Sequence, residues 1–504
     1  MAQTARLNIF SAFIEWFRYN FFTRKFNTIA GWIIMAIVGV AIAYSASIDR
    51  KLPIVEMVGV FGVFFVAIVF RYPLVGFYTA IIGSAFIFLP DKLNIQIPVP
   101  LGVAIEAIQY TTMFSIIAKQ YRARVNISTF WRNPLTIMFV VLLLYYISDI
   151  FNPVPHSTLA WSNYVRKYIS HFAFYYTAFV LLNSYQRIKF FFSVTIFLSL
   201  FIAIYGMKQQ WFGISDFETQ WFHRNPDAYT LAFQSGFLRK FSIMSDPASF
   251  GVLCASMMMF TLVLAVRATS SRRRNWMLVA TLCFLLGSSY SGTRSCNLMI
   301  AAGFLVYILF TINEVRTYFL LIFFVLFAGF MLFGPFKNNL IVQRISTTFQ
   351  GNKDASAMLR SINRHRVQPY IHDHPMGGGI YTCGFEGGAY NKGHYLSNFQ
   401  PDSGFMKILA EQGWIGLLLT LIFYYIFMRR GVKGFFESQN HEIKTWYMAI
   451  TICLFALLAG QYSQVAIAPY PQILFYFPSL VILYKLKDYD TPNPVANDKA
   501  KELL

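Results

Sequence analysis

Apolar segments of roughly membrane-spanning length recur along almost the whole of this 504-residue chain. A helix needs about 20 residues to cross the hydrocarbon core of a bilayer, and few charges interrupt these segments. We therefore predict an all-α polytopic membrane protein with roughly 12–14 transmembrane helices and a large, partly helical outer loop. The segments lie at about 28–47, 53–70, 72–89, 100–118, 133–151, 167–184, 190–206, 248–267, 276–291, 297–313, 318–334, 413–428, 446–467 and 470–484.

The composition argues against a soluble fold. Hydrophobic residues make up 56% of the chain and charged residues 13%, whereas about a quarter of the residues in soluble domains are charged. The 42 Lys and Arg against 22 Asp and Glu leave a net charge of +20, which in a membrane protein reflects topology signals and anionic lipid rather than nucleic acid. Five cysteines without metal-ligand spacing indicate neither a disulfide framework nor a zinc cluster.

Lysine and arginine concentrate in alternate connections when the N-terminus is placed in the cytoplasm. Short cytoplasmic connections are enriched in these residues, so we expect both termini inside and no cleavable signal peptide. Outer loops as long as those predicted here are uncommon and usually functional. The expected parts are an interfacial N-terminal helix at 1–26, a transmembrane bundle at 27–334 with an outer loop at 207–247, a large outer loop at 335–403, C-terminal transmembrane helices at 404–487 and a cytoplasmic tail at 488–504.

Five arginines stand out on the expected outer side: Arg239, Arg294, Arg360, Arg364 and Arg366. An arginine at the membrane boundary is costly unless it is paired, and its planar guanidinium can donate two hydrogen bonds to one phosphate group. We therefore predict that arginines distant in the chain form a pocket for a diphosphate. Other readings stay open: Arg239 meets lipid phosphate, Arg294 serves the structure of its Ser-Gly-Thr turn, and the remaining three lie on a solvated helix face.

Two residues of the outer side are candidates for acid–base chemistry. Asp402 stands where the large loop enters a helix, and a carboxylate there can act as a general base toward a hydroxyl group. The alternative is that Asp402 is the N-cap of that helix. His394 is the second candidate. Asp246, which precedes Pro247, is instead expected to be a structural helix cap.

Other polar residues give weaker signals. His372 and His374 alternate, but no third ligand is evident, so we expect no metal site and no cofactor. The glycine triplet at 377–379 permits sharp turns, but no strand precedes it and no Lys-Ser/Thr follows, so it is not a phosphate-binding motif. Glu56 and Glu106, near the outer ends of spans, are either partners of arginines or part of an ion path.

Four stretches read LRKFSIMSDP at 238–247, SYSGTR at 289–294, an arginine at 360 followed by DHPMGGG at 373–379, and DSGFMKILAEQGWIG at 402–416. In this order they resemble motifs of the O-antigen ligase and polymerase superfamily of bacterial inner-membrane glycosyltransferases. The resemblance covers about 230–430. Ligases of that family usually carry a catalytic histidine where this chain has Asp402, which fits a polymerase or a divergent ligase slightly better than a lipopolysaccharide ligase.

The resemblance implies a glycosyltransferase of surface polysaccharide or lipopolysaccharide biosynthesis, acting on the periplasmic side of the inner membrane. The implied donor is an undecaprenyl-diphosphate-linked glycan, and the implied acceptor is a sugar hydroxyl of another glycan or glycolipid. The implied reaction is an inverting, metal-independent transfer in which Arg239, Arg294 and Arg360 hold the diphosphate and Asp402 takes the proton. A polymerase is slightly favoured over a ligase onto lipid A-core. A transporter or flippase is the rival from another class, although the charged residues concentrate outside rather than at the membrane midplane.

Overall fold

The computed structural model describes residues 27–48, 52–333 and 355–491, together with Glu15 and Tyr19. Most of the predicted N-terminal helix at 1–26, part of the predicted large loop and most of the predicted tail therefore lie outside the described residues. So do the side chains of several helix residues, that of Arg360 among them. The chain divides into two compact units, Met1–Arg71 and Tyr72–Leu504. Single positions left out within the described ranges are Gln96, Pro98, Asn126, Pro155, Ser235 and Asn398.

The first unit contains two long apolar helices, α2 (Ile29–Ile48) and α3 (Leu52–Arg71), which contact each other. The hydroxyl of Ser45 on α2 donates to the carboxylate of Glu56 on α3 at 2.7 Å. Most side chains of α2 are apolar and exposed, which is the pattern of a helix surrounded by lipid. Glu56 thus has a hydroxyl partner within its own unit.

The second unit is built almost entirely of helices. In the described part of the whole chain, nine helices are long and apolar enough to cross a membrane. The other predicted apolar segments also form helices, and the prediction of an all-α polytopic membrane protein is confirmed. The long helices of this unit are α4 (Pro73–Ala85), α6 (Leu101–Ala123), α8 (Pro134–Ser148), α9 (Thr158–Leu181), α10 (Tyr185–Trp211), α13 (Pro247–Val266), α14 (Ser271–Tyr290), α15 (Arg294–Thr311), α16 (Val315–Phe333), α20 (Gly404–Glu437), α21 (His441–Gln461) and α22 (Gln472–Lys485).

The start of α13 shows how local sequence sets a helix boundary. The Asp246 carboxylate accepts hydrogen bonds from the backbone N–H groups of Ala248 and Ser249 at 2.8 and 2.9 Å. Pro247 occupies the first helical position, where its missing N–H leaves no partner unsatisfied. The predicted structural role of Asp246 is therefore confirmed.

Helix α13 lies at the centre of this unit, and almost all of its side chains are buried. It packs against α14, α15 and α21, and small residues at these crossings let the backbones approach closely. At Gly287, for example, a Cβ atom would lie only 2.8 Å from the sulfur of Cys254. All five cysteines are free thiols, and only Cys283 is not fully buried, which agrees with a packing role.

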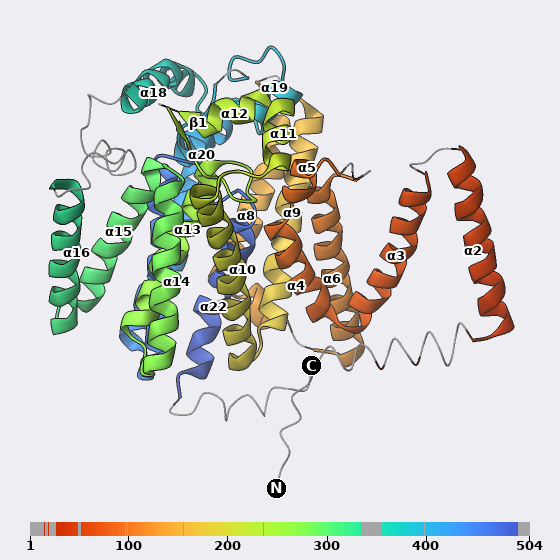
Figure 1. Ribbon diagram of the computed structural model, residues 1–504, viewed down its shortest axis with the longest axis horizontal. Coiled ribbons are helices and arrows are strands. Elements are labelled where there is room, and N and C mark those ends of the chain that lie inside the picture. The colour runs from red at the N-terminus through yellow and green to blue at the C-terminus, as the bar shows by residue number, and fades with distance from the viewer. Residues whose placement is uncertain are drawn as a thin grey trace, which may run out of the picture. The chain divides into compact units, whose positions relative to one another are not determined.

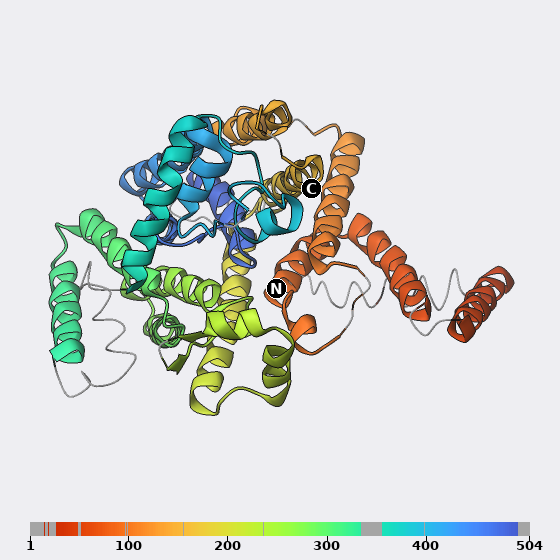
Figure 2. The same cartoon turned by 90° about the horizontal axis from the view of Figure 1, so that it is seen from above.

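Short elements gather at one end of the helical bundle, the upper end in Figure 1 and the face seen in Figure 2. Most of them come from the two predicted outer loops, so both loops lie at the same end. An antiparallel hairpin of two strands, each two residues long and with Phe233 opposite Leu238, was not expected from the sequence. The elements at this end are α5 (Leu89–Lys92), η2 (Asp149–Phe151), α11 (Asp216–Arg224), α12 (Pro226–Ala232), β1 (Phe233–Gln234), β2 (Phe237–Leu238), α18 (Ala355–Asp373) and α19 (Gly384–Tyr390). Two further short helices are α7 (Ser128–Trp131) and η5 (Leu486–Tyr489).

Candidate functional site

The guanidinium of Arg239 is bound to the turn that joins α14 to α15. Its Nε donates to the carbonyl of Ser291 at 3.0 Å, and its Nη2 donates to the hydroxyl of Thr293 at 2.7 Å. Its Nη1 donates to the side chain of Gln234 and to the carbonyl of Leu231 at 3.2 and 3.4 Å. Arg239 is only 9% exposed. Two of the predicted motif stretches, 52 residues apart at this contact, therefore form one structure.

Thr293 stands directly before Arg294, the first residue of α15, but its side chain does not cap that helix. Its hydroxyl instead accepts from Arg239 and donates to the carbonyl of Pro247 at 3.2 Å. Uncapped N–H groups and the positive end of the helix dipole attract anions. The half-buried Arg294 therefore stands at a helix terminus suited to a phosphate group.

Two buried polar residues hold the backbone that follows Arg239. The side-chain oxygen of Gln209 accepts from the N–H of Ser242 at 2.7 Å. The ammonium of Lys92 donates to the carbonyls of Ser242 and Met244 at 2.9 and 2.6 Å. Lys92 and Gln209 were not predicted from the sequence, although an isolated polar residue near the end of an apolar segment is a detectable signal.

Asp402 is half-buried just before α20 and accepts a 3.0 Å hydrogen bond from the side-chain amide of Asn363 on α18. It does not cap α20. Ser403 does so, since its hydroxyl accepts from the N–H of Met406 and also donates to the carbonyl of Gln461 at 2.8 Å. The alternative that Asp402 is the N-cap is therefore wrong, because the next residue satisfies the helix amide.

Arg364 follows Asn363 on α18 and contacts Tyr462, the C-cap residue directly after α21. Its guanidinium donates to the hydroxyl and the carbonyl of Tyr462 at 2.9 and 3.2 Å and lies 4.6 Å from the centre of the Tyr462 ring. The buried Nε of Arg364 has no hydrogen-bond partner among the described residues. Because buried donors nearly always have partners, the described residues leave the hydrogen-bonding capacity of this guanidinium incompletely satisfied.

Close packing between α15 and α21 connects Arg364 with Arg294. A Cβ atom at Gly460 of α21 would lie 2.9 Å from the sulfur of Met299 on α15. Toward the end that carries the short elements, Tyr462 is two residues from this contact and Arg294 is five, which correspond to about 3 and 7.5 Å of helix rise. The two arginines thus lie toward the same end of the bundle, with α21 as the helix that links them. Arg239, Arg294, Arg364 and Asp402 are called the arginine–aspartate cluster below.

The other two predicted arginines of α18 are Arg360 and Arg366. Arg360 lies one helical turn before Arg364, and this spacing places the two positions on one face, but the side chain of Arg360 lies outside the described residues. Arg366 is exposed. Its backbone carbonyl accepts a 3.5 Å hydrogen bond from the hydroxyl of Tyr395, and its guanidinium makes no hydrogen bond or ion pair with any described residue.

His394 lies against the second half of α18. Its Nδ1 accepts from the N–H of Leu396 at 3.1 Å, and its Nε2 lies 3.5 Å from the hydroxyl of Tyr370. Since Nδ1 accepts, the neutral ring is assigned the tautomer with its proton on Nε2. Burial lowers the pKa of His394 below its ordinary value, and the nearby rings of His156 and His374 lower it further.

The two acid–base candidates therefore contact different parts of α18. Asp402 meets Asn363, whereas His394 meets Tyr370, which is seven residues further along, or about 10 Å of helix rise. No hydrogen bond or ion pair joins Asp402 to His394 in the described part of the chain. Asn363 and Tyr370 were not predicted, since a polar residue on an amphipathic helix gives no sign of the partner it meets.

The glycine triplet at 377–379 packs on a break in α20. Gly413 has a φ of 65°, a conformation that glycine adopts readily and other residues avoid. The break frees the carbonyls of Ala410 and Glu411, which accept from the N–H groups of the second and third glycines at 2.8 and 3.0 Å. The triplet therefore anchors the large loop to a helix that carries Asp402 at its start.

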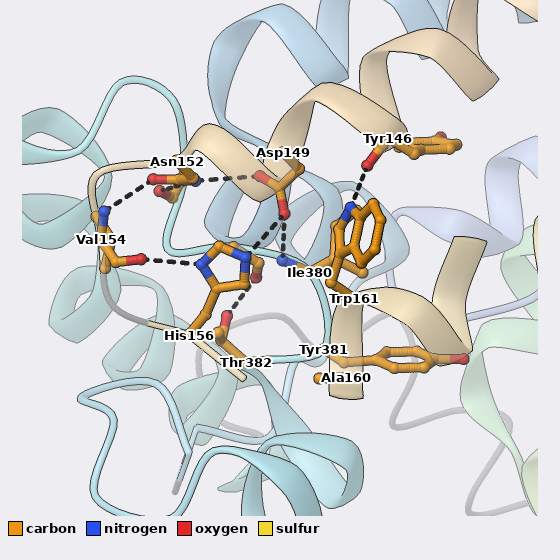
Figure 3. Close-up of polar contacts among 12 residues, drawn as sticks. Tyr146, Asp149, Asn152, Val154, His156, Ala160, Trp161, Ile380, Tyr381 and Thr382 are labelled. Atoms are coloured by element: carbon orange, nitrogen blue, oxygen red, sulfur yellow. Dashed lines mark hydrogen bonds and ion pairs between the residues drawn. The ribbon is translucent and has the colours of Figure 1, made fainter. Parts of the chain in front are cut away.

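Asp149 also holds this loop, through the backbone N–H of Ile380, as Figure 3 shows. Its carboxylate accepts from the N–H of Ile380 at 3.0 Å and from the side-chain amide of Asn152 at 3.1 Å. The same amide donates to the carbonyl of Gly377 at 3.2 Å, and Nε2 of His156 lies 3.8 Å from Asp149. These three residues were missed, although polar residues in a short connection between two apolar segments are a signal for such a role.

The structure also bears on the predictions for Glu106 and for the histidines His372 and His374. Glu106 forms an ion pair with Arg166 at 3.3 Å, so the reading of Glu106 as a partner of an arginine is confirmed. His374 stacks on Tyr370 with ring centres 4.1 Å apart, and His372 is exposed. Among the described residues no group of three His, Cys, Asp or Glu side chains is placed to hold a metal ion.

One segment of the chain matches the model of a known protein family. Residues 277–421 match the model of the Wzy_C family, described as O-antigen ligase. The match includes the turn with Arg294, helix α18, the glycine triplet and Asp402, whereas Arg239 precedes it. A comparison with curated proteins finds no match. The chain is therefore a multi-pass membrane protein in which residues 277–421 are similar to the O-antigen ligase domain described by the Wzy_C family.

Proposed function

We propose that this protein transfers a glycan from undecaprenyl diphosphate to a sugar hydroxyl at the periplasmic face of the bacterial inner membrane. The Wzy_C match supports glycan transfer of the O-antigen ligase or polymerase type. The observation that carries the proposal is the pair of hydrogen bonds made by the Thr293 hydroxyl. Because its hydroxyl binds Arg239 and Pro247, it leaves the start of α15 without a side-chain cap beside Arg294.

The donor diphosphate binds Arg294, Arg364 and the N–H groups at the start of α15. Arg239 positions the turn and adds positive charge, and Arg360 lies one turn from Arg364 on the same helix. Arg366, which is exposed, contributes charge only at a distance. Negative charge grows on the diphosphate as its bond to the sugar breaks, and preorganised guanidinium and N–H groups stabilise that charge. These groups supply the positive charge of the site, so the transfer needs no metal ion or cofactor.

Asp402 acts as the general base. The acceptor hydroxyl oxygen attacks the anomeric carbon on the face opposite the diphosphate, and the new C–O bond forms as the bond to the diphosphate breaks. The electron pair of the broken bond leaves with the diphosphate, and the hydroxyl proton passes to Asp402. Attack from the opposite face inverts the anomeric carbon. His394 fits this role less well, because its neutral ring carries a proton on Nε2.

The opposite end of the bundle carries the basic residues of the predicted cytoplasmic connections. Arg267 pairs with Glu314 at 2.8 Å, and Arg273 pairs with Glu442 at 3.2 Å. The enrichment of Lys and Arg in cytoplasmic connections supports a cytoplasmic location for that end of the bundle and a periplasmic location for the arginine–aspartate cluster. Both termini are proposed to lie on the cytoplasmic side.

The reaction is best tested with purified protein in lipid nanodiscs and an undecaprenyl-diphosphate-linked oligosaccharide repeat. The wild-type chain should yield a longer or transferred glycan, detected by mass spectrometry. Arg294→Ala should abolish the product, whereas Arg366→Ala, which removes an exposed arginine, should retain it. An unchanged glycan linkage with the wild-type chain would indicate a transporter and overturn the proposal, as would full activity of Arg294→Ala.

The acceptor distinguishes the two branches of the proposed reaction. A polymerase, slightly favoured because Asp402 stands where related ligases usually carry a histidine, extends another lipid-linked repeat. A ligase transfers the chain to lipid A-core. In a deletion strain, loss of long chains with one repeat still attached indicates a polymerase, whereas full-length chains accumulated on the carrier lipid indicate a ligase.

A further inference from the structure

A cavity of about 210 Å³ lies among α8, α9, α20 and α22, and α19 and the segment after α21 also contribute to its wall. An engineered protein cavity of about 150 Å³ holds one benzene molecule, so this cavity has room for one substituted six-membered ring. Gly404 lines it and is two residues from Asp402. Its most frequent lining residue is tyrosine: Tyr146, Tyr164, Tyr168, Tyr381, Tyr424 and Tyr476.

Three polar atoms from three different helices lack partners at this cavity. They are Oε1 of Gln412, Nε2 of His171 and the hydroxyl oxygen of Tyr476, none of which has a hydrogen-bond partner among the described residues. The three residues are only 4%, 6% and 2% exposed. Buried polar groups in native proteins nearly always have a partner, so three unpartnered atoms on residues that line one cavity point to a polar occupant.

The charged residues of the cavity wall are balanced. Lys407 pairs with Glu386 at 3.3 Å, and Glu411 accepts from the N–H of Cys383 at 3.1 Å. Lys167 makes no hydrogen bond or ion pair with the described residues. Two lysines and two glutamates line the cavity, so their formal charges cancel and the wall offers no net charge that would select a charged occupant. A lipid tail would leave the polar atoms without partners, which is unfavourable.

We infer that this cavity binds one neutral sugar residue of the acceptor glycan. Sugar hydroxyl groups both donate and accept hydrogen bonds, which matches a wall that offers an ammonium group, an amide oxygen, an imidazole nitrogen and phenol hydroxyls. Tyrosine rings provide apolar surface for the C–H face of a sugar ring and a polar edge for its hydroxyls. The identity of the sugar as part of the acceptor rests on the proposed function, whereas its binding in the cavity does not.

The test uses the full-length chain in nanodiscs and four neutral probes, the methyl glycosides of glucose, galactose, mannose and N-acetylglucosamine. Saturation-transfer NMR measures binding. At least one probe should bind, and Tyr476→Phe should weaken that binding roughly two- to tenfold, the usual range for one hydrogen bond. Tyr78→Phe is the matched control, because its hydroxyl is also buried without a partner among the described residues but lies on α4 outside the cavity.

Each outcome decides the inference. Binding of a probe that weakens in Tyr476→Phe and not in Tyr78→Phe supports it. Failure of all four glycosides to bind, or equal binding by wild type and Tyr476→Phe, overturns it and leaves a cavity filled by water. Arg294→Ala separates this result from the proposed function, since it should abolish glycan transfer without changing the affinity for the free glycosides.

Discussion

The side-chain amide of Asn363 on α18 donates a 3.0 Å hydrogen bond to one carboxylate oxygen of Asp402, 39 residues further along the chain. The amide nitrogen can only donate, so the contact fixes the orientation of the carboxylate oxygen that accepts from it. The contact also brings the start of α20 next to Arg364, whose own partner is Tyr462. A base and an anion-binding group from separate parts of the sequence thereby lie on neighbouring elements.

Asp402→Asn should lower the rate of glycan transfer by about 10²- to 10⁴-fold, since an amide cannot take the proton of the acceptor hydroxyl. Asn363→Ala should lower the rate less, because it leaves the carboxylate present but less well oriented. Turnover of purified variants in nanodiscs measures both effects. Asp373→Asn, which changes an exposed carboxylate on the same helix, is the control. An Asp402→Asn enzyme as active as that control would remove Asp402 from the mechanism.

Thr293→Val should destabilise the protein by about 1–3 kcal/mol, because it leaves a buried N–H of Arg239 and the carbonyl of Pro247 without this partner. Thr293→Ser keeps the hydroxyl and should stay close to the wild-type stability. Thermal unfolding in nanodiscs, followed by tryptophan fluorescence, compares the two variants. The same stability in both would show that the hydroxyl bridge contributes nothing measurable.

Gly413→Ala should disrupt the junction between α20 and the glycine triplet. A left-handed φ costs a residue with a Cβ about 1–3 kcal/mol, and the new atom would overlap the carbonyl of Pro375 and the backbone nitrogen of Gly377. Gly388→Ala is the matched control, because a Cβ there meets nothing within 4 Å and alanine favours a helix. Unfolding temperatures should fall for the first variant only. Equal unfolding temperatures for the two variants would contradict the role assigned to the break.

Because the pKa of His394 is lowered, the free energy of unfolding should depend on pH. Below about pH 6.5 a histidine in the unfolded chain binds a proton. The buried ring of His394, near His156 and His374, remains unprotonated there because its pKa is lowered. The unfolded state then holds more protons, so the free energy of unfolding declines as the pH falls toward the lowered pKa. Tyr370 does not titrate in this range, since burial raises its pKa to about 12.

Unfolding temperatures measured from about pH 7.5 down to about pH 5.5 test this expectation. The wild-type chain should lose more stability over that interval than His394→Gln, whose amide does not titrate. Parallel declines in the two proteins would mean that other groups carry the pH dependence.

Sequence patterns predicted the elements of this fold well, because the bilayer restricts what the backbone can do. In lipid every backbone polar group must be satisfied within the segment, so a long apolar run has to be a helix. Local chemistry was equally direct at Asp246, where a carboxylate before a proline predicted the cap that α13 has. At the start of α20 the sequence left Asp402 open as either a general base or the N-cap, and the structure has Ser403 as the N-cap instead.

The sequence by itself determined a helical membrane protein, the segments that form its helices and the motifs that resemble one glycosyltransferase family. Only the tertiary structure decided which polar groups meet: Arg239 with Thr293, Asp402 with Asn363, and the three unpartnered atoms around one cavity. The physical reason is that a helix which is apolar all round gives no periodic sign of the face that its neighbour covers. Contacts between helix ends therefore depend on how the whole bundle packs, and a pattern within one segment does not contain that information.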